Sequence, residues 1–230
     1  MNLSQNVRAE ELRKERVLCV GFLIDNSGSM NSYQEVVPRA WETYIDLIRN
    51  SSEKNDILVN PIIFGSGNPE SRGYRFIEDQ VSIRYSANDD HTNLYNSIAI
   101  SLQELNETVA TYKAEGFNRT RGLLIILSDG IDNVGGGEAR RHAINAIDAT
   151  EKSGGMVAYI AFGEDAYGEA ERLGVKHVKE TNATVEDLQD LFITASQSTI
   201  QYSKSNGIQT GKNFFDNTMH GNGNGRRVNR

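Results

Sequence analysis

The stretch VLCVGFLIDNSGSM, residues 17–30, joins a continuous apolar run to a turn-rich segment of oxygen-bearing side chains. The run 17–24 is short, uninterrupted and includes β-branched residues, which predicts a strand buried on both faces. Such strands belong to parallel sheets that are covered by helices on each side. Ligands of an open parallel sheet bind outside the carboxyl ends of its strands, which is where residues 25–30 are expected to lie.

The rest of the chain alternates further apolar runs with segments of helical periodicity. We expect strands at 57–64, 74–77, 123–127, 157–162 and 175–178, and helices near 33–48, 94–109, 139–152 and 185–202. Strands that alternate with helices favour right-handed crossovers. The sequence therefore predicts an α/β fold: a doubly wound, mostly parallel six-stranded sheet with helices on both faces and one short antiparallel edge strand.

Three regions are expected along the 230 residues. Residues 1–16 are polar and lack the apolar segment of a signal peptide, which favours a cytoplasmic location. Residues 17–203 contain all the predicted strands and helices and are enough for one core. Residues 204–230 are rich in Gly and Asn and show no periodicity, which predicts a disordered tail.

Composition excludes several classes of protein. The formal net charge is −7, with 24 Lys and Arg against 31 Asp and Glu, whereas a general nucleic-acid binder needs a basic surface. The single cysteine, Cys19, excludes an internal disulfide and a multi-cysteine metal site. The apolar runs are too short to span a bilayer. We therefore expect neither a nucleic acid nor a membrane as the partner.

Oxygen-bearing side chains gather at the predicted carboxyl ends of the strands. They are Asp25, Ser27 and Ser29 after the first strand, Thr92 before the second helix, and Asp129 after the run 123–127. Each of them alone is more typical of a turn or a helix cap. Together they form an oxygen-only set, which suits a hard divalent cation such as Mg²⁺. Hydroxyl ligands are neutral, so the bound ion would stay electrophilic toward an outside carboxylate.

The segments 23–30 (LIDNSGSM), 92–98 (TNLYNSI) and 127–133 (LSDGIDN) resemble a von Willebrand factor A (VWA) domain with a metal-ion-dependent adhesion site. The resemblance covers about residues 17–200 and implies a Rossmann-like VWA fold. It implies that the hydroxyls of Ser27, Ser29 and Thr92 bind Mg²⁺ or Mn²⁺ directly. It also implies that Asp25 and Asp129 act largely through water, and that the open coordination position accepts an acidic side chain of a partner protein.

Two functions remain open at this point. The first is a non-enzymatic, metal-dependent protein-binding module without catalytic or cofactor-binding residues. Among such modules, the chain resembles the stand-alone bacterial VWA proteins of the tellurium-resistance type. The resemblance implies an AAA+ ATPase or a stress-response cluster protein as the acidic partner. The alternative is a Mg²⁺-dependent phosphatase that resembles the haloacid dehalogenases and uses Asp25 as nucleophile. Those enzymes have a second aspartate at the position of Ser27.

Overall fold

A computed structural model describes residues 16–181, 184–205 and 213–216. Its sheet has five parallel strands and two short antiparallel ones at one edge, in the order β3-β2-β1-β5-β6-β7, with β4 also paired to β2. The parallel strands are β1 (Leu18–Asp25), β2 (Ile57–Phe64), β5 (Arg121–Ser128), β6 (Met156–Phe162) and β7 (His177–Thr181), and the antiparallel ones are β3 (Glu70–Ser71) and β4 (Arg75–Phe76). The predicted fold class is confirmed; the predicted edge strand 74–77 corresponds to β4, and β3 is a further short strand that was not predicted.

The central strands end level with one another. Leu18 pairs with both Ile57 and Arg121 at the start of β1, and Asp25 pairs with Phe64 at its end. The carboxyl ends of β1, β2 and β5 therefore open onto the same edge of the sheet. Loops that leave these three ends are brought together by the register alone.

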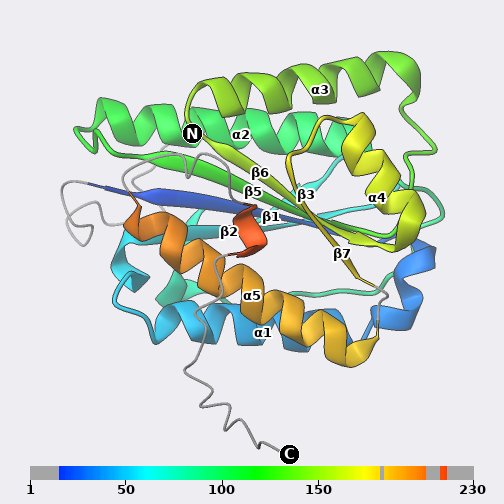
Figure 1. Cartoon of the computed structure of the whole chain (residues 1–230), viewed down its shortest axis with the longest axis horizontal. Coiled ribbons are helices and arrows are strands. Elements are labelled where there is room, and N and C mark those ends of the chain that lie inside the picture. The colour runs from blue at the N-terminus through cyan, green and yellow to red at the C-terminus, as the bar shows by residue number, and fades with distance from the viewer. Residues whose placement is uncertain (1–15, 182–183, 206–212, 217–230) are drawn as a thin grey trace, which may run out of the picture.

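In the described part of the chain, five α-helices cover the two faces of the sheet (Figure 1). On one face lie α1 (Val36–Arg49) and α5 (Val185–Lys204), and on the other lie α2 (Leu94–Ala114), α3 (Gly136–Lys152) and α4 (Gly163–Arg172). Short 3-10 turns occur at Gly28–Tyr33, Lys54–Asp56, Ile77–Asp79 and Phe214–Asp216. Helix α4 was not predicted because it buries only Ala166, Glu169 and Ala170, which leave no large apolar periodicity to detect.

Two hydrophobic layers enclose the sheet. In β1, Phe22 faces α1 and α5, whereas Leu23 faces the opposite layer. The Phe22 ring stacks on Phe192 of α5 at 5.1 Å between centroids and meets the edge of Tyr44 of α1 at 5.2 Å. Because both faces of the central strands are buried, their sequences are continuously apolar.

Part of the predicted disordered tail is packed against the domain, so that prediction is wrong for residues 213–216. Phe214 and Phe215 are only 2% and 4% exposed and join the core beside α5. The Phe214 N–H donates to His177 Nδ1 at 3.1 Å, and the Asn213 amide donates to the Val178 carbonyl at 3.1 Å. Residues 213–216 thus lie against both α5 and the edge strand β7. The average composition of the tail gives no sign of this packing.

Lys204 and Ser205 of the predicted tail are also described, and Lys204 is the last residue of α5. Residues 206–212 and 217–230 of the tail, and residues 1–15 of the predicted N-terminal leader, lie outside the described part of the chain. Within that described part, no helix has both the length and the apolar character that crossing a membrane requires.

Candidate metal centre

The structure brings four of the five predicted metal-site residues into direct or near-direct contact. Asp25 is the last residue of β1, and Asp129 immediately follows β5. Ser27 Oγ lies 3.1 Å from Ser29 Oγ, and Ser29 Oγ donates to Asp129 Oδ1 at 2.9 Å. Asp25 Oδ1 accepts the backbone N–H of Ser27 at 2.8 Å. One chain of hydrogen bonds therefore connects the end of β1 to the end of β5.

Asp25 is fully buried and held from two sides. Its Oδ1 accepts the Ser27 N–H, and its Oδ2 accepts the Ser128 hydroxyl at 2.5 Å. Ser128 was not predicted as a site residue; its position in the sequence, at the end of the strand that pairs with β1, was the available signal. This double support fixes the orientation of the Asp25 carboxyl group.

Burial disfavours the charged form of both carboxyl groups. It raises the pKa of Asp25 to about 6, against the lowering effect of hydrogen bonds from Ser128 and Ser27. Burial also raises the pKa of Asp129, which Ser29 partly offsets. Among the described residues, the groups that oppose these increases in pKa are hydrogen-bond donors, and none of them is a cation. A cation placed between the two groups would favour their ionised forms.

Thr92 is positioned by the loop that follows β5. Its N–H donates to Asn133 Oδ1 at 2.9 Å, and the Asn133 N–H donates to the Thr92 carbonyl at 3.1 Å. A Cβ atom added to Gly130 would lie 3.9 Å from Thr92 Oγ1, so the hydroxyl faces the residue next to Asp129. The Thr92 side chain is buried, and in the described segments its hydroxyl has no hydrogen-bond partner. This free oxygen is available to a ligand.

Asn26 organises a second loop around the site. Its Oδ1 accepts the N–H groups of Ser86 and Ala87 at 3.1 and 2.8 Å, and its Nδ2 donates to Asp89 Oδ2 at 3.1 Å. The Asp89 carbonyl in turn accepts the N–H of Gly28 at 2.8 Å. Residues 86–89 are therefore held by hydrogen bonds to the loop that carries Ser27 and Ser29.

The carboxylates of Asp89 and Asp132 are occupied by structural contacts. Asp89 lies over Gly65, where an added Cβ atom would come within 1.9 Å of the carboxylate. Asp132 Oδ2 accepts the N–H of Tyr95 at the start of α2 at 2.8 Å, and its Oδ1 accepts the N–H groups of Val134 and Gly135. Asp132 thus orders the turn that precedes α3 and links it to the start of α2.

The chemistry of this donor set fits a hard divalent ion. It offers the hydroxyls of Ser27, Ser29 and Thr92 and the carboxylates of Asp25 and Asp129, all of them oxygen. Among the described residues there is no cluster of three or more His, Cys, Asp or Glu side chains suited to a metal. A metal held here would therefore depend on neutral hydroxyls, with only two carboxylates to balance its charge.

No family model matches the chain, and no curated protein does. Solved structures do resemble it. The pilus adhesin SpaC of Lactobacillus rhamnosus GG has 12% identity and a TM-score of 0.64, covering 84% of this chain and 31% of the adhesin chain. Manganese-loaded TRAP protein of Plasmodium vivax has 17% identity and a TM-score of 0.51, covering 78% of this chain and 74% of that one. Human COPII-coat protein Sec24c has 11% identity and a TM-score of 0.55, covering 85% and 34%.

These similarities show the fold, which is VWA-like. The chain spans 31% of the length of the adhesin. At such low identities the similarities concern the arrangement of helices and strands and do not extend to the side chains of the site.

Proposed function

We propose that this chain is a divalent-metal-dependent protein-binding module in which an acidic residue of a partner completes the coordination of Mg²⁺ or Mn²⁺. The observation that carries the proposal is the convergence of Asp25, Ser27, Ser29, Thr92 and Asp129 at one edge of the sheet. The manganese-loaded state of one protein with a similar fold adds support.

Each residue has a separate task in this proposal. The hydroxyls of Ser27, Ser29 and Thr92 would hold the ion directly, and Asp25 and Asp129 would act largely through water. The bound ion would supply an electrophilic position for a partner carboxylate. Ser128 holds the carboxyl group of Asp25 in place.

The burial of Asp25 supports binding over catalysis. A phosphatase nucleophile must reach the phosphorus atom of its substrate. Asp25 is 0% exposed, and both of its carboxylate oxygens accept hydrogen bonds from the protein. Position 27, where haloacid dehalogenases have an acid, is a serine with its hydroxyl beside Ser29. Turnover of a generic phosphomonoester that needs Mg²⁺ and disappears in Asp25→Asn would reverse this conclusion.

The finer assignment rests on sequence resemblance. We include in the proposal a stand-alone bacterial protein of the tellurium-resistance type, located in the cytoplasm, with an AAA+ ATPase or a stress-response cluster protein as its acidic partner. An affinity pull-down in Mg²⁺ and in EDTA, read by mass spectrometry, tests this part. The partner should be retained only in Mg²⁺.

Calorimetry of Mg²⁺ and Mn²⁺ binding tests the metal role itself. Ser29→Ala removes an exposed hydroxyl of the site without disturbing the core. Ser52→Ala is a matched control, because Ser52 is also exposed but precedes β2, at the amino ends of the strands. We expect Ser29→Ala to lose at least about tenfold in affinity, as for one charge-assisted contact, and Ser52→Ala to match the wild type. Equal affinity of all three proteins would refute the proposal.

A further inference from the structure

The loop between β5 and α3 exposes two large apolar side chains beside the metal centre. Of the large hydrophobic side chains in the described residues, four are exposed: Val81, Ile100, Ile131 and Val134. Ile131 and Val134 are 44% and 47% exposed and share the loop that also carries Asp129. Exposed apolar residues are ordinary when scattered, but a pair beside a candidate binding site indicates a contact surface.

The backbone under these two side chains is fixed. Asp132, which lies between them, binds the N–H of Tyr95 in α2 and the N–H of Val134. Asn133 is hydrogen-bonded to Thr92 in both directions. The apolar side chains are therefore presented from an ordered loop, which reduces the entropy lost when a partner binds.

The opposite side of the metal centre is polar. A cavity of about 380 Å³ lies there, between the connection that follows β2 and the segment 84–89. Asn26 and Asp89, which hold the Ser27 loop in place, form part of its wall, so the cavity adjoins the metal centre. Glu70 and the exposed Arg84 also line it, and Arg84 makes no ion pair or hydrogen bond with another described residue. Arg84 is therefore free to pair with a polar or acidic group of a partner, beside the Glu70 and Asp89 carboxylates that line the same cavity.

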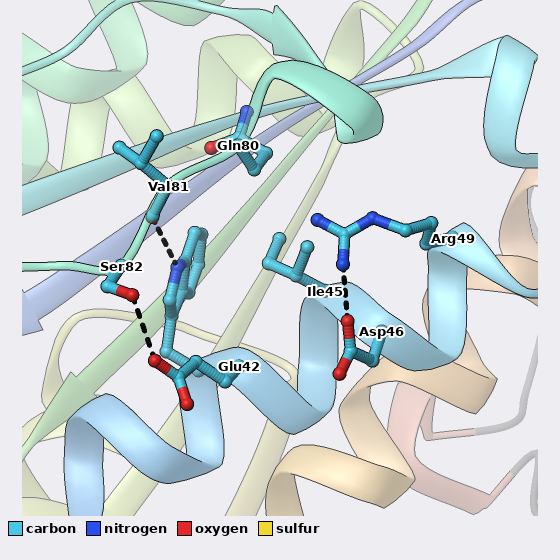
Figure 2. A pocket seen from close by; sticks show the side chains of 8 residues that line it. Glu42, Ile45, Asp46, Arg49, Gln80, Val81 and Ser82 are labelled. Atoms are coloured by element: carbon cyan, nitrogen blue, oxygen red, sulfur yellow. Dashed lines mark hydrogen bonds and ion pairs between the residues drawn. The ribbon is translucent and has the colours of Figure 1, made fainter.

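A second hollow, over α1, is less suited to recognition. Figure 2 shows this hollow, with Val81 among the residues that line it. Its volume is about 240 Å³. Its polar groups are already paired: Ser82 donates to Glu42 at 2.9 Å, and Arg49 forms an ion pair with Asp46. The groups around the metal centre, in contrast, leave Arg84 and the Thr92 hydroxyl without partners within the described segments.

We propose that this face binds an acidic segment of a partner protein in which the metal-binding Asp or Glu has an aliphatic neighbour. The aliphatic side chain packs on Ile131 and Val134, and the other flank of the segment, which is polar, lies over the cavity beside Arg84. This inference rests on the proposed function and adds which partner sequences this chain prefers to bind.

Fluorescein-labelled peptides test the preference with the full chain in Mg²⁺. The probes are Gly-Gly-Leu-Asp-Gly-Gly and Gly-Gly-Asp-Leu-Gly-Gly, each with a counterpart in which Ser replaces Leu and one in which Asn replaces Asp. By fluorescence anisotropy, at least one Leu peptide should bind roughly fivefold more tightly than its Ser counterpart, the effect of burying about 40 Å² of apolar surface. The Asn peptides should not bind.

A double variant and a matched control test whether the preference for Leu comes from the loop between β5 and α3. Ile131→Ser with Val134→Ser should abolish the preference for Leu, whereas Val81→Ser with Ile100→Ser should keep it. All four positions are exposed, and thermal melting checks that each variant is folded. Equal binding of Leu and Ser peptides by the wild type would overturn the inference, as would a preference that survives in the loop variant or in EDTA.

Calorimetry on the same proteins separates the two proposals. The wild type and the loop variant should bind Mg²⁺ equally. If Mg²⁺ binds but Leu has no effect, the sequence preference alone is refuted. If Mg²⁺ does not bind to the wild type, the proposed function itself fails.

Discussion

Replacing Asn26 by Asp tests how the loops around the metal centre are held together. The Asn26 amide donates to the Asp89 carboxylate at 3.1 Å, while its oxygen accepts two backbone N–H groups. In Asn26→Asp the two acceptor contacts can remain, but the donor is replaced by a second negative charge. Losing a hydrogen bond to a charged group costs about 1.5–3 kcal/mol. Like-charge repulsion adds to this loss, and stronger bonds to the backbone N–H groups offset part of it.

We therefore expect Asn26→Asp to lower the free energy of unfolding by about 2 kcal/mol, or the melting temperature by about 4–8 °C for a chain of this size. Urea unfolding in EDTA measures it without any metal contribution. Adding Asp89→Asn reverses donor and acceptor, so the double variant should recover most of the loss. An Asn26→Asp protein as stable as the wild type would refute the reasoning, as would a double variant no more stable than Asn26→Asp alone.

Three further predictions concern the surroundings of the site and the packed tail segment. Gly65→Ala should cost about 1–3 kcal/mol in urea unfolding, because its Cβ would overlap Asp89, whereas the same change made in an Asp89→Gly background should cost much less. Phe214→Ala should cost about 3 kcal/mol in the same assay, because the ring is 2% exposed; an unchanged midpoint would show that the segment is not packed. Burial lowers the pKa of His177, so the unfolded chain takes up a proton first as the pH falls. The contribution of neutral His177 to the free energy of unfolding should be complete above about pH 6.5, and it should be lost as the pH falls through the lower pKa of the folded state. The variant His177→Asn keeps an acceptor for the Phe214 N–H and should lack this part of the pH dependence.

The sequence was sufficient for the main features of the fold because the central strands are buried on both faces. A short, uninterrupted apolar run such as 123–127 is typical of a buried strand, and its end determines where Asp129 lies. The strand ends in turn predict which oxygen-bearing side chains share an edge of the sheet. The grouping of Asp25, Ser27, Ser29 and Asp129 could therefore be predicted from order and spacing.

The positioning residues could not be predicted in the same way. Asn26, Ser128 and Asn133 act through hydrogen bonds to segments 60, 103 and 41 residues away in the chain. A polar residue at the end of a strand or in a turn gives no local sign of such distant partners. The same limit applies to Phe214 and Phe215, whose packing on the edge of the sheet depends on tertiary structure that the Gly- and Asn-rich composition does not reveal.

Anomalous scattering from crystals grown with Mn²⁺ tests the central claim most directly. The account predicts an anomalous peak enclosed by the hydroxyl oxygens of Ser27, Ser29 and Thr92, at the edge of the sheet where β1 and β5 end. A map from well-ordered crystals with no peak among these three oxygens at saturating Mn²⁺ would contradict it.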